Sequence, residues 1–197
     1  LTEQFLHNPI RVEVARQATA GENIEQRVVK HRPPRKEMAD SQKRELLRAL
    51  VTAEGAKLTN GIVFCNRKRD VDVVAKSLKK HGFNAAPIHG DLDQSLRMKT
   101  LAGFRDNEIT LMVASDVAAR GLDIPTVSHV FNFDVPIHSE DYVHRIGRTG
   151  RAGRSGTAIT LCFPHEQKHL DKIEEMLGMP IPEVASPLGG GVAEEAE

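Results

Sequence analysis

The chain has 197 residues, of which 40% are hydrophobic and 27% are charged. This length and composition predict one globular domain that is large enough for a substantial core. Basic and acidic residues number 27 each, so the formal net charge is zero. A non-specific polyanion binder would normally be basic overall, so we expect any contact with nucleic acid to be local to one face.

The apolar runs indicate whether the chain could enter a membrane, and the cysteines indicate the redox state of its compartment. The sequence has no apolar run long enough to cross a bilayer and no signal-peptide pattern, so we expect no membrane association. Cys65 and Cys162 lie in strand-like apolar runs, which predicts buried free thiols in a reducing compartment, the cytoplasm. Because the chain begins at Leu1 rather than at a methionine, we expect it to be a piece of a longer protein.

Strand-like and helix-like segments alternate along the chain. A weakly alternating lead-in spans residues 1–23, with strand alternation at 11–14. Ser41 and Ser139 are candidate caps of two helices. In chain order we predict a strand at 24–31, a helix at 38–53, a strand at 61–66, a helix at 70–81, a strand at 85–89, a helix at 94–105, strands at 110–114 and 127–133, a short helix from 139, a strand at 157–163 and a helix at 165–177.

This alternation predicts an α/β domain of three layers, with a mainly parallel central sheet flanked by helices. We place the folded domain at residues 24–180. Residues 181–197 contain a glycine triplet and an acidic end without an apolar pattern, so we expect a disordered tail there.

Polar loops follow four of the predicted strands, at 66–69, 89–91, 115–123 and 134–136. Ligands bind at the carboxyl ends of parallel strands in open α/β sheets, so these loops should converge on one edge. Each loop taken alone is as well explained by a solvated surface. Their joint placement is what favours a binding site.

The first two of these loops carry groups suited to phosphate. Residues 66–69 combine an amide with three cations just before a helix, whose N-terminal amides also attract anions. Gly90 would allow a phosphate to approach the backbone closely, which a Cβ would hinder. Gln94 and Arg97 fall on one side of the next helix's first turn, although alone they would be an ordinary surface pair.

The most informative stretch is His144–Arg151, which continues to Gly156 with arginine and glycine each recurring every third residue. Glycines at this spacing should end a helix near Gly147 and leave a loop that carries fixed positive charge. The planar guanidinium matches the paired oxygens of phosphate, and such groups can stabilise a transferring phosphoryl group as arginine fingers. A solvated basic face or a generic nucleic-acid patch is the alternative.

Residue by residue, this stretch resembles motif VI of the DEAD-box RNA helicases, His-Arg-x-Gly-Arg-x-Gly-Arg. The resemblance implies that Arg148 and Arg151 face the γ-phosphate of ATP and that His144 links to the partner domain. It assigns no ligand to Arg145.

Residues 114–123 are similar to motif V of the same family. The resemblance implies that Ser115, which replaces the usual threonine, contacts an RNA phosphate and that Asp123 accepts a hydrogen bond from the nucleotide ribose beside Gly121. Asp116 and Arg120 are expected to form an ion pair that holds this loop.

Two further motifs extend the resemblance. Asn66 and Arg67 are similar to motif IV, where a threonine is usual at the position of Arg67. The region from Gly90 and Asp91 to Gln94 and Arg97 is similar to motif IVa. The family resemblance implies that all of these residues contact RNA.

As a whole, the resemblance implies a C-terminal RecA-like domain, with residues 1–23 similar to the interdomain linker of bacterial RhlE-like members. The 197 residues contain neither the phosphate-binding glycine loop nor the acidic Mg²⁺-binding motif of such an ATPase. We therefore expect an N-terminal RecA-like domain in cis to hold ATP and Mg²⁺, RNA and RNA-processing complexes to be partners, and this chain alone to be inactive. A non-catalytic RNA-binding or dimerisation module and a DNA-directed translocase half are the alternatives.

One motif points elsewhere. His165-Glu166-Gln167-Lys168-His169 fits the zinc-protease pattern His-Glu-x-x-His. The match lies at the expected solvated start of the last helix, and such a site also needs a third ligand. We therefore predict no metal site here.

Overall fold

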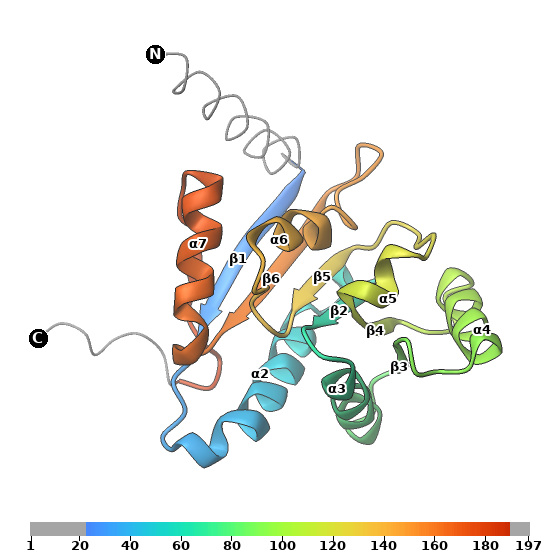
Figure 1. The fold of residues 1–197 in the computed structure, drawn as a ribbon, viewed down its shortest axis with the longest axis horizontal. Coiled ribbons are helices and arrows are strands. Elements are labelled where there is room, and N and C mark those ends of the chain that lie inside the picture. The colour runs from blue at the N-terminus through green and yellow to red at the C-terminus, as the bar shows by residue number, and fades with distance from the viewer. Residues whose placement is uncertain (1–22, 190–197) are drawn as a thin grey trace, which may run out of the picture.

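The computed structural model describes residues 23–189, which form a seven-stranded sheet with helices on both faces (Figure 1). All of its strand pairs are parallel, and the strand order is β3-β4-β2-β5-β6-β1-β7. The strands are β1 (Ile24–Lys30), β2 (Gly61–Cys65), β3 (Ala85–Ile88), β4 (Leu111–Ser115), β5 (His129–Asn132), β6 (Gly156–Cys162) and β7 (Glu183–Val184).

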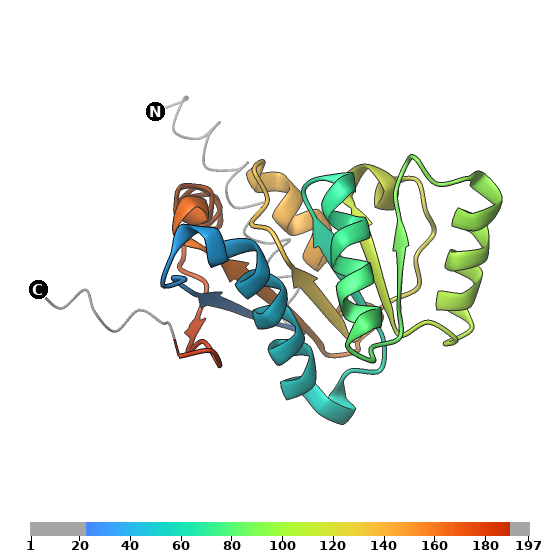
Figure 2. The same cartoon turned by 90° about the horizontal axis from the view of Figure 1, so that it is seen from below.

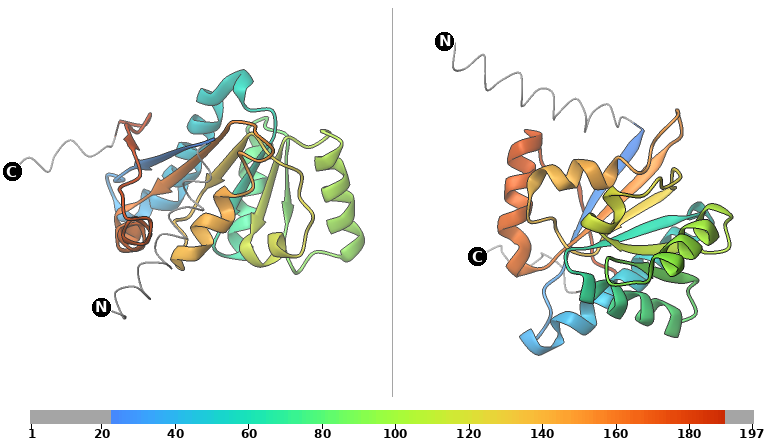
Figure 3. Two further views of the ribbon diagram at one scale, coloured as in Figure 1. Left: turned by 90° about the horizontal axis from the view of Figure 1, so that it is seen from above. Right: turned by 45° about the vertical axis from the view of Figure 1, so that its right-hand side comes forward.

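The helices divide into two layers, which Figures 2 and 3 show on opposite faces of the sheet. One layer contains α2 and α3, and the other contains α4, α5, α6 and α7. Their bounds are α2 (Ala39–Glu54), α3 (Lys68–Lys80), α4 (Gln94–Arg105), α5 (Asp116–Arg120), α6 (Ser139–Ile146) and α7 (Gln167–Leu177), with short 3-10 turns η1 (Lys36–Met38), η2 (Gly55–Lys57) and η3 (Pro164–Glu166).

Each central strand contributes to both cores, because successive side chains of a strand point to opposite faces. Val28 and Ile62 pack in the core beneath α4 to α7, whereas their neighbours Val29 and Val63 pack beneath α2 and α3. All five residues of β2 are buried. The continuous apolar runs in the sequence thus reflect strands covered on both faces.

The three-layer α/β fold with a parallel sheet is confirmed, and the predicted strands and helices after residue 23 all occur, with shifted ends. Both predicted caps are wrong. Met38 and His138 occupy the N-cap positions, Ser41 instead donates a hydrogen bond to the carbonyl of Met38, and Ser139 makes no capping bond. The strand predicted at 11–14 and the rest of the expected linker up to residue 22 lie outside the described residues.

The predicted boundary of the tail also differs from the structure. Residues 181–189 continue the folded unit instead of leaving it. Ile181 is buried, β7 pairs with β1, and the hydroxyl of Ser186 lies 3.0 Å from Nδ1 of His31. A short apolar and hydrogen-bonding contact is enough to order this segment, although its sequence has no strand periodicity.

Within residues 23–189, no helix has the length and apolar character needed to cross a membrane. Because the strands are parallel, the carboxyl ends of β2, β3, β4 and β5 lie at one edge of the sheet. This edge is where the polar loops lie, and we refer to it as the carboxyl edge.

Candidate functional site

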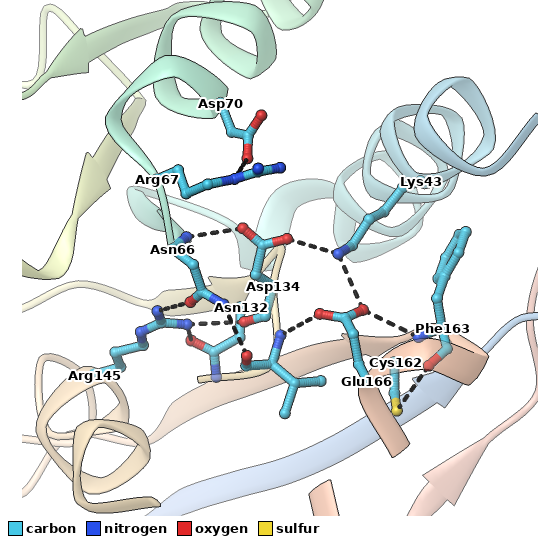
Figure 4. Close-up of polar contacts among 11 residues, drawn as sticks. Lys43, Asn66, Arg67, Asp70, Asn132, Asp134, Arg145, Cys162, Phe163 and Glu166 are labelled. Carbon is cyan, nitrogen blue, oxygen red and sulfur yellow. Dashed lines mark hydrogen bonds and ion pairs between the residues drawn. The ribbon is translucent and has the colours of Figure 1, made fainter. Parts of the chain in front are cut away.

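Polar contacts join the loops at the carboxyl edge: Figure 4 shows those between the loops after β2 and β5, and Arg145 of α6 bridges Asn66 after β2 to Asp116 after β4. The backbone N–H of Asn66 donates to Oδ2 of Asp134 at 2.8 Å, which ties the loop after β2 to the loop after β5. Lys68 reaches across to Asp91 at 3.1 Å, which ties the loop after β2 to the loop after β3. The predicted convergence of these loops is therefore confirmed.

Arg145 is the centre of this edge, and its role was not predicted. It projects from α6 and is only 1% exposed. Its guanidinium forms a bidentate ion pair with Asp116 (2.8 and 2.7 Å) and donates to Oδ1 of Asn66 at 2.7 Å and to the carbonyl of Asp134 at 2.8 Å. The group also lies 5.3 Å from the ring centre of Phe64. These contacts use the donors of Arg145 inside the protein, so the residue holds the loops together and does not reach a ligand.

A signal for this burial was present in the sequence. Tyr142, Arg145 and Ile146 are spaced as one face of a helix, and the structure buries all three. Two apolar neighbours at this spacing indicate that Arg145 points into the core. The partner of such an arginine, however, cannot be read from helical spacing.

The expected ion pair between Asp116 and Arg120 is wrong. Asp116 pairs with Arg145, and Arg120 pairs instead with Asp141 on α6 at 2.8 Å. The i, i+4 spacing suggested a local pair, but α5 has only five residues and lies against α6. Both charged side chains therefore find partners in α6.

Arg148 and Arg151 lie just beyond α6 and differ from Arg145 in their surroundings. Arg148 donates to the carbonyl of Ala119 at 3.3 Å, and Arg151 donates through Nε to the carbonyl of Gly147 at 2.7 Å. Within the described part of the chain, neither guanidinium forms an ion pair with a carboxylate. Partial burial, together with the nearby charge of Arg151, lowers the pKa of Arg148. Two neighbouring cations without carboxylate partners among the described residues make this turn locally positive.

Arg148 also connects this pair to the end of α5. Its acceptor, Ala119, is two residues before Gly121, which ends α5. Asp123 follows with a side chain that is 99% exposed, and Arg105 holds its backbone carbonyl with a 2.6 Å hydrogen bond. His144 is 68% exposed and lies 3.9 Å from Asp141. The predicted nucleotide-facing residues therefore lie around the ends of α5 and α6.

The residues predicted to contact RNA fall into two groups. Asn66 and Ser115 are committed to internal contacts: the Asn66 amide binds Arg145 and the carbonyl of Val135, and the buried Ser115 hydroxyl accepts from the N–H of Ala118. These two side chains shape the loops from within, and the Ser115 hydroxyl still has a proton to donate.

The second group is exposed or, for Arg97, partly exposed. Arg67 pairs with Asp70 at the start of α3, Asp91 pairs with Lys68, and Arg97 donates to Gln94 at 3.3 Å on the first turn of α4. Gly90 is open: its φ is not positive, and a Cβ there would have no neighbour within 4 Å. Neither packing nor backbone conformation requires glycine at that position, which leaves its exposed backbone accessible to a ligand.

The zinc-protease pattern has a structural role. The Glu166 carboxylate is buried, accepts hydrogen bonds from the N–H groups of Val135 and Phe163, and lies 3.0 Å from Nζ of Lys43. It is therefore unavailable as a general base. Across residues 23–189, no three His, Cys, Asp or Glu side chains are grouped to hold a metal ion.

A family model described as the helicase conserved C-terminal domain matches residues 42–153, more than half of the chain. The chain belongs to this helicase C-terminal domain family. Its sequence is 40% identical, over 173 residues, to the ATP-dependent RNA helicase CshA of Limosilactobacillus reuteri. The aligned part is 88% of this chain and 33% of the relative, so the chain spans about a third of that relative's length.

Solved structures agree with this assignment. The domain resembles the Escherichia coli DEAD-box protein SrmB, in a complex with regulator of ribonuclease activity A, with a TM-score of 0.74 and 37% identity over 82% of this chain and 90% of that chain. It resembles Saccharomyces cerevisiae Dbp5 bound to RNA and ADP BeF3 with a TM-score of 0.73 and 29% identity over 84% and 42% of the two chains. The helicase domain is thus a RecA-like C-terminal domain of the DEAD-box type. The narrower RhlE-like resemblance stays a prediction.

Proposed function

We propose that this domain is the C-terminal half of an ATP-dependent DEAD-box RNA helicase, and that Arg148 and Arg151 are its arginine fingers. The observation that carries the proposal is the pair of adjacent guanidinium groups, neither of which is neutralised by a carboxylate in residues 23–189. By contrast, Arg145 and Arg120 in the same region each have a carboxylate partner. Fixed positive charge that is left free at the end of a helix suits the charge that develops on a transferring phosphoryl group.

In this proposal ATP is held mainly by an N-terminal RecA-like domain in cis, and the present domain completes the site. Asp123, whose side chain is exposed, would accept a hydrogen bond from the ribose, with Gly121 lining the approach. His144 would contact the partner domain from the exposed face of α6. The described residues offer no carboxylate cluster for Mg²⁺, so we assign that ion to the N-terminal domain.

RNA would bind along the same carboxyl edge mainly through its phosphates. Arg67, Gln94 and Arg97 are exposed or partly exposed there and can donate to phosphate, whereas the exposed Asp91 carboxylate would accept from a ribose 2′-hydroxyl. Gly90 leaves its backbone open, and Asn66 and Ser115 fix the shape of the loops. Contacts to phosphates position a strand without reading its bases. We therefore expect binding to single-stranded RNA without strong sequence preference.

The experiment is RNA-stimulated ATP hydrolysis by the full-length protein that contains this chain. Arg148→Gln and Arg151→Gln should each lower kcat by roughly 10³–10⁵-fold, the range for loss of an arginine finger. Arg154→Gln is the matched control, because Arg154 is an exposed arginine of the same loop.

Three other outcomes would overturn the proposal. If both variants hydrolyse ATP like the control and only RNA affinity changes, the domain is a binding module. If DNA stimulates hydrolysis as well as RNA does, the substrate class is wrong. RNA-stimulated ATP hydrolysis by the 197-residue chain alone would contradict the proposal that an N-terminal domain holds ATP.

We further propose a cytoplasmic location and partners among RNA-processing proteins. Cys65 and Cys162 are free and buried, which fits a reducing compartment. The complex of SrmB with regulator of ribonuclease activity A is a precedent for such partners in a related protein. Pull-down with this chain, followed by RNase treatment, separates direct protein partners from those bridged by RNA.

A further inference from the structure

Lys43 is a buried lysine that approaches the carboxyl edge from the opposite face of the sheet to Arg145. Lys43 belongs to α2, in the helical layer opposite α6, and its side chain is 7% exposed. It forms ion pairs with Asp134 at 2.6 Å and Glu166 at 3.0 Å. Its ammonium also lies 4.9 Å from the ring centre of Phe133.

Figure 4 shows that these contacts continue toward α6 without a gap. One oxygen of Asp134 binds Lys43, and the other accepts from the backbone N–H of Asn66 at 2.8 Å. The Asn66 side chain then accepts from Arg145 at 2.7 Å. Four residues thus connect α2, the loop after β5, the loop after β2 and α6 in one continuous chain of hydrogen bonds. We call this chain the Lys43 relay.

The charges in the relay explain why Lys43 is needed. Burial alone would lower the pKa of Lys43, but the negative charges of Asp134 and Glu166 outweigh it and keep the pKa above its ordinary value. The lysine is therefore charged at neutral pH. Without it, the carboxylates of Asp134 and Glu166 would have no cation between them, and the Asp134 side chain would keep only its hydrogen bond from the Asn66 N–H.

Asp134 controls two neighbours of the site at once. Its side chain fixes the backbone of Asn66, and its carbonyl accepts from Arg145 at 2.8 Å. A displacement of Asp134 would therefore move two acceptors of Arg145, the carbonyl of Asp134 and the side-chain oxygen of Asn66. Because Arg145 lies in α6 immediately before the glycine-spaced turn, its position also determines where that turn presents Arg148.

We propose that Lys43 is a positioning residue of the helicase site, which sets the loop after β2 and the orientation of Arg145 through the Lys43 relay. Lys43 itself touches neither nucleotide nor RNA in this account. The inference rests on the proposed function for its effect on ATP hydrolysis, whereas its structural part can be tested independently.

The first measurement follows the Arg145 Nε–H resonance by NMR in the 197-residue chain. This proton is bound to Asp116 and should exchange slowly with solvent. Lys43→Met should shift the resonance and accelerate exchange by at least about tenfold, equivalent to about 1.4 kcal/mol. Lys43→Arg should restore much of the protection because it keeps the charge. Lys57→Met, which changes an exposed lysine in η2, should have no effect.

The second measurement compares kcat and KM for ATP in the full-length protein below the unfolding temperature of each variant. Lys43→Met should lower kcat by at least about tenfold with little change in KM, since the ATP-holding domain is untouched. If Lys43→Met does not fold, Asp134→Asn keeps the size of the side chain, weakens the same link and should give the same two changes.

An unchanged Arg145 resonance in a folded variant would overturn the proposal. A lowered unfolding temperature with kcat unchanged would also overturn it, since that result describes a purely structural lysine. If the resonance responds but Arg148→Gln has full activity, the proposed function fails while the relay stands.

Discussion

Replacing Arg145 with methionine should destabilise the domain severely, because the arginine is buried and bound on several sides. Methionine keeps much of the volume but removes all donors, which leaves the Asp116 carboxylate and the Asn66 amide oxygen without partners. Breaking a buried ion pair costs about 3–5 kcal/mol, and an unsatisfied amide adds about 1–3 kcal/mol. Asp116 is 19% exposed and can recover some hydration, which offsets part of these two costs. We therefore expect the free energy of unfolding to fall by about 3–5 kcal/mol.

The assay is urea unfolding of the 197-residue chain, with Arg154→Met as the control for an exposed arginine. With an m value of about 2 kcal/mol per molar urea, the loss corresponds to a midpoint lower by about 2 M. The control should change stability by no more than about 0.5 kcal/mol. A loss below about 1 kcal/mol for Arg145→Met would refute the view that this residue organises the carboxyl edge, since an ordinary surface contact has that magnitude.

The other predictions concern stability in acid and two glycines. Burial alone would raise the pKa of Glu54, but hydrogen bonds from His129 and Arg27 outweigh it and hold the pKa below its ordinary value. Glu54 therefore stabilises the fold above the ordinary glutamate pKa and loses this contribution as the pH falls through the lowered value. Urea midpoints across this range should show the deficit of Glu54→Gln shrinking in acid, and a deficit independent of pH would contradict this. Gly156→Ala should destabilise the fold, because its Cβ would overlap Thr149 and approach the backbone nitrogen of Gly150 at 2.6 Å. Gly90→Ala should leave the urea midpoint unchanged or slightly higher and weaken binding of a fluorescent single-stranded RNA, whereas equal RNA affinity would remove the role proposed for that loop.

Much of the architecture was predictable because local patterns determine it. The continuous apolar run of β2 indicated a strand buried on both faces, and the strand–helix alternation indicated a parallel sheet. A parallel sheet in turn places the loops after its strands at one edge. The end of α6 at Gly147 followed from glycine spacing alone.

The polar core of the site was not predictable in the same way, because its partners are far apart in sequence. Arg145 and Asn66 are separated by 79 positions, and Lys43 and Asp134 by 91. No helical or strand periodicity encodes such pairs. Lys43 precedes Leu46 and Leu47 by three and four positions, which places it on the buried face of α2, but helical spacing cannot name the carboxylates that pair with it. Where local spacing did suggest a pair, between Asp116 and Arg120, tertiary contacts with α6 overrode it.

The most direct test of the central claim is the affinity of the full-length protein for two nucleotides in the presence of RNA. ADP lacks a γ-phosphate, whereas ADP with beryllium fluoride carries a mimic of that group. If Arg148 and Arg151 act on the γ-phosphate, Arg151→Gln should weaken binding of the beryllium fluoride complex by at least about tenfold, since hydrogen bonds to charged groups are worth about 1.5–3 kcal/mol, and should leave ADP binding nearly unchanged. Equal losses for both nucleotides, or no loss for either, would contradict the account.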